Sequence, residues 1–340
     1  MKKELLVATA LVSTLGIAGV ANAASMSMSG AHKVGVSGQD LDSSTTNSRT
    51  ADQQSTFSIS VSETTDAGMK ISTGFDLAEE SFSYDPSGLT LTFTDGSSLD
   101  LVEAGTATAS HVAAIPGAGG EQGVSATTTN NAPTSLTMAA ASNAVGFEYH
   151  TAADAFGVEG LKASVSFASN DVALVTVAAQ TASIESTYSV GVTYVTTAGD
   201  STVTVAGGFV NASNNSSATT KENEAIQFGL TAVTGDLTVG VGIASGDYIT
   251  TPTAGGDAVQ VDGEFTKAGV SYVSGDITFA VGMTSAEGKD EAYGTATAGA
   301  ADTTDTQSAS IAYAVASGVT ATIGYTDVDD ANEGAASTNT

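Results

Sequence analysis

Residues capable of catalysis or metal binding are few and widely separated in this sequence. The three histidines, His32, His111 and His150, lie far apart, and none forms an H-E-x-x-H or similar metal-binding pattern. The chain has no cysteine, so it has neither disulfides nor thiolate chemistry. It also lacks the G-x-S-x-G motif of serine hydrolases and the G-K-S/T phosphate loop. We therefore predict no catalytic site, no metal site and no cofactor, and we interpret each imidazole as solvated or facing a water-filled interior.

A second set of candidates consists of charged residues inside segments that alternate between apolar and small polar residues. Lys70, for example, lies between Met69 and Ile71. In an extended strand, such a charge points to the face opposite its apolar neighbours. The members of this set are Lys33, Lys70, Asp76, Glu148 and Lys162.

The elements that position these residues are predicted to be short β-strands joined in hairpins. The stretch 270–283 alternates apolar and small residues on both sides of Ser274-Gly275-Asp276, which is the pattern of a β-hairpin. Similar pairs recur along the chain, so we predict about fifteen strands. They are expected near residues 26–36, 55–63, 69–77, 81–85, 89–94, 143–149, 160–168, 186–195, 201–210, 224–233, 237–245, 260–273, 277–284, 308–316 and 319–326.

The two faces of these strands differ in a way that indicates a membrane. One face is apolar and uncharged, whereas the other carries Ser, Thr, Ala and Gly; Phe279 and Thr278 are typical neighbours. Aromatic residues gather near the short turns (Tyr149, Tyr194, Tyr272, Tyr313) and near the long loops (Phe75, Phe93, Phe167, Phe209, Tyr325). We predict an all-β transmembrane antiparallel β-barrel with lipid outside and a water-filled lumen. A charge on the lipid face costs about 2–4 kcal/mol at the midplane, so the charges above should face the lumen.

The first 23 residues have the composition of a secretory signal peptide. Lys2 and Lys3 precede an apolar run, and Ala21-Asn22-Ala23 is a small-x-small cleavage site. No later stretch has the roughly 18 uncharged apolar residues that a membrane-spanning helix requires. If the mature chain crosses a membrane, strands must do it.

The chain is strongly acidic. It has 37 Asp and Glu against 9 Lys and Arg, a net charge of −28, and removal of residues 1–23 makes the net charge −29. Such a surface repels polyanions, which excludes nucleic acid as a partner.

The segment SFSYDPSGLTLTFTDG, residues 81–96, together with the hairpins and the signal peptide, resembles the general porins of Gram-negative outer membranes in their alphaproteobacterial form. The resemblance extends over the whole mature chain. It implies a 16-stranded barrel, a homotrimer, and a third loop, here residues 95–142, that folds inward to constrict the pore. The carboxylates of that loop are Asp95, Asp100, Glu103 and Glu121.

Two features depart from the family pattern. Family members end in a strand that closes with an aromatic residue, whereas this chain ends in Thr340. Because fifteen strands is also an odd number, we expect residues 24–340 to be a porin domain that lacks its last strand. The family constriction carries an arginine cluster, whereas Arg49 is the only arginine here.

The predicted function is that of a water-filled channel for passive diffusion of small hydrophilic solutes and ions, with a preference for cations. The expected surroundings of the barrel are the lipid of the bacterial outer membrane. The alternative is an acidic secreted or surface-layer adhesin without a pore. Acidic loops such as 327–333 carry carboxylate oxygens that could bind Ca²⁺ weakly. They lack the residue spacing of an EF-hand, so the sequence does not identify a specific Ca²⁺ site.

Overall fold

Antiparallel β-strands make up nearly all of the regular structure. The computed structural model describes residues 6–9, 25–39, 48–78, 83–101, 106–117, 145–177, 180–216, 222–250, 259–291, 301–332 and 338–339. Within these ranges, no helix is long and apolar enough to span a membrane. The helical elements described are α1 (Ala107–Ser110) and the single 3₁₀ turn η1 (Ala155–Gly157).

Fifteen consecutive strands, β2 to β16, form one sheet. Their bounds are β2 (Ser25–Gln39), β3 (Ser48–Thr64), β4 (Lys70–Ala78), β5 (Ser83–Thr92), β6 (Ser98–Leu101), β7 (Val145–His150), β8 (Leu161–Val177), β9 (Gln180–Ala198), β10 (Ser201–Ser216), β11 (Glu222–Thr234), β12 (Leu237–Thr250), β13 (Val259–Ser274), β14 (Ile277–Glu291), β15 (Ala301–Ala316) and β16 (Val319–Asn332). Two short strands, β1 (Leu6–Thr9) and β17 (Thr338–Asn339), join the same sheet.

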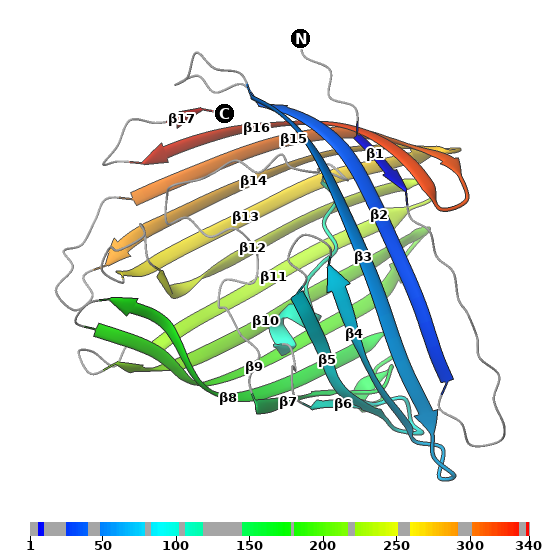
Figure 1. Cartoon of the computed structure of the whole chain (residues 1–340), viewed down its shortest axis with the longest axis vertical. Coiled ribbons are helices and arrows are strands. Elements are labelled where there is room, and N and C mark those ends of the chain that lie inside the picture. Colours follow the sequence, from blue (N-terminus) through cyan, green and yellow to red (C-terminus); the bar gives the residue numbers. More distant parts are fainter. Residues whose placement is uncertain are drawn as a thin grey trace.

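Each of the fifteen strands pairs antiparallel with the next one in the sequence, as hairpin connections require. Gly235 and Gly275 have φ values of +56° and +59°, and they form the tight turns after β11 and β13. Only glycine adopts this conformation without strain, which explains why a glycine occupies each of these two turns. The sheet curls round on itself, so that β2 and β16 approach each other (Figure 1).

The alternation predicted from the sequence fixes which side chains face outward. Val239, Val270 and Val281 are direct neighbours across β12, β13 and β14. All three are exposed, and Val281 reaches 53%. Ala280, which neighbours Val281 in the chain, is buried on the opposite face. A continuous exposed apolar band of this kind is the surface that a membrane-spanning barrel presents to lipid.

Closure of the ring occurs between β2 and β16. Both strands pair antiparallel with β1, so β2 and β16 run in the same direction and cannot form an antiparallel pair with each other. Leu6–Thr9 bridges the gap over four residues, between 319–322 of β16 and 32–35 of β2. An antiparallel ring therefore needs one strand at this place, and residues from the predicted signal peptide occupy part of it.

The predicted number of strands agrees with the fifteen of β2 to β16, although two strands were assigned incorrectly. The segments 81–85 and 89–94 form one strand, β5, which has a register shift opposite Thr73 and Phe75. The short strand β6 was missed because four residues are too few for alternation to stand out. Phe93, predicted to lie beside a long loop, begins the short turn between β5 and β6.

Candidate functional site

Segment 106–117 lies along the inner wall of the sheet. It contains α1, whose cap residue Thr106 accepts a hydrogen bond from the Ala109 N–H. The Ala107 N–H donates to Ser166 Oγ on β8 (3.0 Å), and Thr108 Oγ1 donates to the Phe209 carbonyl on β10 (3.0 Å). The segment is thereby attached to β8 and β10, the two strands that flank β9 in the sheet.

The side chain of Gln227 on β11 holds the end of α1. Its Nε2 donates to the carbonyls of Thr108 (2.8 Å) and His111 (3.0 Å), and the residue is only 3% exposed. The Thr108 carbonyl also accepts the capping hydrogen bond from the His111 N–H (3.3 Å), and the His111 carbonyl lies at the C-terminal end of this one-turn helix, where intrahelical donors run out. Gln227 therefore replaces the water that would otherwise solvate the backbone of the segment.

Glycines on the wall provide the space in which the segment lies. An added Cβ at Gly191 would overlap the Ala107 carbonyl, and one at Gly269 would overlap the Pro116 carbonyl. At Gly282 it would lie 2.9 Å from Gly117 Cα. The glycines whose Cβ would meet the segment come one from each strand from β9 to β14: Gly191, Gly208, Gly229, Gly240, Gly269 and Gly282. We call this set the glycine lane.

After α1, the segment alternates between wall and lumen. His111, Ala113 and Ile115 are buried against the wall, whereas Val112 and Ala114 are exposed. Ala113 and Ile115 belong to an apolar cluster with inward side chains of the wall, Ala206, Val210, Ala225, Ala244, Phe265 and Ala286. Burial of this apolar surface adds to the hydrogen bonds that hold the segment.

A polar network surrounds the start of the segment. His111 Nδ1 is 2.7 Å from Thr193 Oγ1, and its Nε2 is 2.7 Å from Ser164 Oγ. Ser164 Oγ also lies 2.7 Å from His150 Nδ1. The network therefore joins the segment to β7, β8 and β9 through hydroxyl and imidazole groups.

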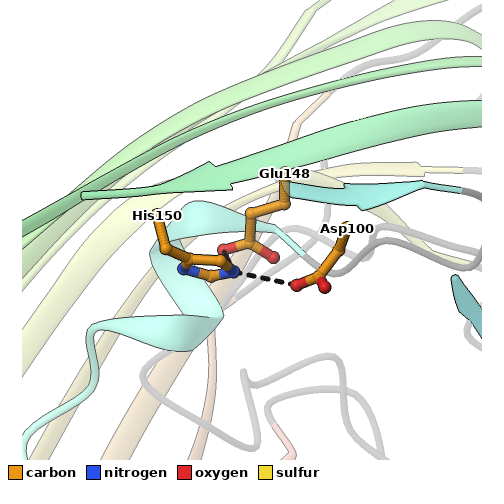
Figure 2. Close-up of side chains that lie close together, drawn as sticks. All are labelled: Asp100, Glu148 and His150. Carbon is orange, nitrogen blue, oxygen red and sulfur yellow. Dashed lines mark hydrogen bonds and ion pairs between the residues drawn. The ribbon is translucent and has the colours of Figure 1, made fainter. Parts of the chain in front are cut away.

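Asp100, Glu148 and His150 converge next to this network (Figure 2). His150 Nε2 lies 3.0 Å from Asp100 Oδ2 and 3.7 Å from Glu148 Oε1. The register places Asp100 of β6 opposite Glu148 of β7, and His150 follows two residues later on the same face. The carboxylates and the imidazole thus come from adjacent strands and meet on the inner wall.

Burial shifts the titration of His111. Its pKa is lowered from the ordinary 6.5, chiefly because burial disfavours the imidazolium, and the nearby His150 and Lys162 act in the same direction. His111 is therefore a neutral hydrogen-bonding residue at pH 7.

The predicted lumen residues divide into three groups. Lys33, Lys70, Asp76 and Lys162 lie on the inward face of β2, β4 and β8 and are exposed. Asp100 and Glu148 lie on the same face and are brought together with His150. Glu103 and Glu121 lie outside the described residues.

The inward segment begins later than the predicted loop 95–142. Asp95 accepts hydrogen bonds from the Ser97 N–H (3.0 Å) and Oγ (2.7 Å), which lower the pKa of its carboxyl and close a tight turn. Strand β6 follows this turn, so Asp95 lies in the turn and Asp100 on the wall. The described part of the inward segment, residues 106–117, contains no Asp or Glu.

Sequence reasoning did not single out Lys267 or Gln227, and it treated His111 and His150 as isolated imidazoles, solvated or facing the lumen, rather than as parts of one network. Lys267 lies mid-strand between Thr266 and Ala268 on β13, so the same parity rule would have placed it on the inner wall. Gln227 lies between Ile226 and Phe228 on β11, so the parity rule would also have placed its side chain on the inner wall. For His111 no local signal exists, because its partners come from β8 and β9.

Comparisons with known proteins agree with this architecture. A family model described as Gram-negative porin matches residues 7–333. The fold is similar to DcaP, an outer-membrane channel of Acinetobacter baumannii (TM-score 0.64, 10% identity, 95% of this chain and 96% of that chain covered). It is also similar to an anion-selective porin from Comamonas acidovorans (0.58, 11%, 91% and 90%) and to a trimer form of Vibrio cholerae OmpT (0.55, 12%, 93% and 94%). No curated protein matches the sequence.

Proposed function

Because the chain belongs to the Gram-negative porin family, we propose that it forms a water-filled pore for passive diffusion of small hydrophilic solutes, with a preference for cations. The protein is an antiparallel β-barrel channel of the bacterial outer membrane and not an enzyme. The solute class and the cation preference are the proposal.

The observation that carries the proposal is the seat of segment 106–117 on the inner wall. The glycine lane and the Gln227 contacts hold the segment against one side, so it narrows the lumen from that side. Elsewhere the inward face carries hydroxyls that pair across strands, such as Ser27 with Ser60 at 2.6 Å. Small hydroxyl groups of this kind offer no specific binding pocket, so neutral solutes should pass according to size.

Charge at the long-loop end supports cation preference. Glu264 lies directly opposite Glu287, and Asp305 lies directly opposite Asp329; all four are exposed on the outward face, beyond the apolar band and around the long-loop rim of the barrel. Like charges in these positions repel each other, and together with the net charge of −28 they produce a negative potential that extends about 8 Å into physiological salt. Cations are concentrated near such a surface.

Lysines on the inner wall act in the opposite direction. The charged side chains described on the inward face are the lysines Lys33, Lys70, Lys162 and Lys267 and the carboxylates Asp76, Asp100 and Glu148. The proposal therefore depends on the acidic outer end and on loop carboxylates more than on the wall itself. The sign of selectivity is the quantity that decides between them.

Reversal potential in a planar bilayer under a potassium chloride gradient tests the preference directly. We expect the sign of a cation-selective pore at low salt, and a smaller potential at high salt, because screening weakens exposed charges. An anion-selective sign at low salt would mean that the wall lysines control permeation.

Two further parts of the proposal concern the mature protein. We propose a homotrimer, supported by the trimer form of the similar Vibrio cholerae OmpT and testable by cross-linking in native membranes. Residues 1–23 are proposed as a signal peptide, so the N-terminus of the membrane-inserted protein should be Ala24 by mass spectrometry.

Weak Ca²⁺ binding at the acidic loops stays a prediction.

A further inference from the structure

The group of Asp100, Glu148 and His150 has the donor set of a metal site. One ligand atom from each residue lies within 4.8 Å of the other two. The shortest separation, His150 Nε2 to Asp100 Oδ2, is 3.0 Å, and His150 Nε2 to Glu148 Oε1 is 3.7 Å. Two ligand atoms of a tetrahedral or octahedral ion with bonds of about 2.0–2.2 Å lie roughly 3 Å apart, so the three atoms need only small adjustments.

Each of the three side chains is oriented by a hydroxyl outside the group. Ser164 Oγ contacts His150 Nδ1 at 2.7 Å, Thr90 Oγ1 donates to Asp100 Oδ1, and Ser110 Oγ donates to Glu148 Oε1 at 2.7 Å. The contact at Nδ1 turns Nε2 toward the carboxylates, and the contact at Oδ1 leaves Oδ2 directed at the imidazole. Outer partners of this kind are the usual support of histidine and carboxylate ligands.

The charge and accessibility of the group also suit a cation. Two carboxylates and one imidazole carry an excess of negative charge, and among the described residues no lysine or arginine forms an ion pair with either carboxylate. Glu148 is nearly buried at 3% side-chain exposure, whereas His150 and Asp100 are 27% and 29% exposed on the inner wall. An ion could therefore reach the group from the lumen.

We propose that Asp100, Glu148 and His150 bind a divalent transition-metal ion, of which Zn²⁺ is the representative, on the inner wall of the pore. The imidazole favours Zn²⁺, Cu²⁺ and Ni²⁺ over Ca²⁺ and Mg²⁺, which prefer oxygen ligands alone. Three protein ligands leave at least one position for water, so the ion exchanges with the lumen. From the sequence, His150 was interpreted as a solvated or lumen-facing imidazole and not as a metal ligand. That interpretation did not include β6, the strand that brings Asp100 beside His150.

A bound ion would affect the pore in two ways. It replaces local negative charge with positive charge, and it occupies part of the lumen beside segment 106–117. Micromolar Zn²⁺ should therefore lower single-channel conductance and shift the reversal potential toward that of anions, whichever sign it starts from, and a chelator should reverse both changes. The proposal needs only a water-filled lumen, so it does not depend on the sign of the pore's selectivity.

The test is Zn²⁺ and Co²⁺ binding to the full chain, produced in outer membranes without a histidine tag and purified in detergent. We expect one strong Zn²⁺ site by calorimetry and Co²⁺ absorption bands that report nitrogen and oxygen ligands. His150→Gln should weaken Zn²⁺ binding at least about tenfold, and Ser164→Ala, which removes the support at Nδ1, should also weaken it about tenfold. Asp100→Asn is the second ligand variant, and heat-modifiable gel mobility shows that each variant is folded.

His32→Gln is the matched control. His32 lies on β2, belongs to no group of three potential metal ligands among the described residues, and contacts Ser55 Oγ at 2.8 Å. It should leave Zn²⁺ affinity unchanged. Zn²⁺ binding that survives both His150→Gln and Asp100→Asn would overturn the proposal and place the ion on the acidic outer surface, and a folded parent protein without Zn²⁺ binding would overturn it as well. Neither result bears on the reversal potential in potassium chloride.

Discussion

The imidazoles of His111 and His150 hydrogen-bond to one hydroxyl oxygen, Ser164 Oγ, each at 2.7 Å. His111 belongs to the inward segment and His150 to β7, so this hydroxyl links a loop residue to the barrel wall. Ser164 has one O–H proton to donate, so it donates to one imidazole and accepts from the other. The arrangement accommodates two neutral rings or one charged ring, but two imidazolium groups would leave the serine proton without a partner.

Acidification should therefore weaken the folded barrel. The pKa of His111 lies below 6.5 in the folded state, and the unfolded state titrates near 6.5. The unfolded chain then binds more protons, so the stability present above pH 6.5 is lost as the pH falls toward the folded pKa. Charged groups facing His111 are His150 on β7 and Lys162 on β8, and both oppose its protonation. The measurement is the midpoint of heat-induced unfolding on gels at pH 7.5 and 5.5.

His111→Gln separates this effect from general acid sensitivity. Glutamine keeps hydrogen-bonding capacity toward Thr193 or Ser164 but does not titrate. The variant should lose part of the difference between pH 7.5 and 5.5, whereas His32→Gln should keep all of it. Equal pH dependence in the parent and in His111→Gln would show that another group governs acid sensitivity.

The glycine lane predicts a large effect from a single methyl group. Gly269→Ala places a Cβ on the Pro116 carbonyl, so the segment must move into the lumen or the strand must shift. Overpacking of this kind costs about 1–3 kcal/mol. We expect lower conductance or a lower midpoint of heat unfolding.

Gly324→Ala is the control for this prediction. Gly324 lies on β16, and its added Cβ would meet the nearest atom, the Ala309 carbonyl oxygen, at an ordinary 3.7 Å. It should leave conductance and stability nearly unchanged. If both variants behave alike, the segment does not press on the wall at Gly269.

Much of the barrel could be predicted from sequence because strand pairing follows local rules. Alternation placed Val281 outward and Lys162 inward, and Gly275 marked the turn, all without knowledge of distant residues. The seat of the segment could not be predicted in this way. The glycines of the lane look like small lumen residues until Ala107 and Pro116 are brought against them, and these contacts join residues more than 80 positions apart.

The group around His150 was missed for a related reason. Asp100 was assigned to a loop because the turn at Asp95 and the four-residue strand β6 gave no visible alternation. Once β6 pairs with β7, the register alone puts Asp100 opposite Glu148. A short strand between a turn and a long loop thus determines where the carboxylates meet.

Outward and inward positions on β14 should differ in their access to water. Because the chain has no cysteine, Val281→Cys and Thr278→Cys each introduce a single thiol. Val281 lies on the exposed apolar band, and Thr278 has the opposite parity. A membrane-impermeant thiol reagent applied to outer membranes should label Thr278→Cys and spare Val281→Cys. Equal labelling of the two would contradict a lipid-facing band.

The two aspartates that the sequence placed in one loop should behave differently in selectivity measurements. Asp95 lies in the turn between β5 and β6 and is engaged by Ser97, whereas Asp100 lies on the inner wall beside His150. Asp100→Asn removes a negative charge from the wall, so it should shift the reversal potential toward anions at low salt. Asp95→Asn keeps the acceptor oxygen of the turn and should leave the potential unchanged. Because both substitutions remove one charge from the same chain, net charge cannot account for a difference between them. A larger shift from Asp95→Asn would place the selective region at the short-turn end of the barrel instead of beside segment 106–117.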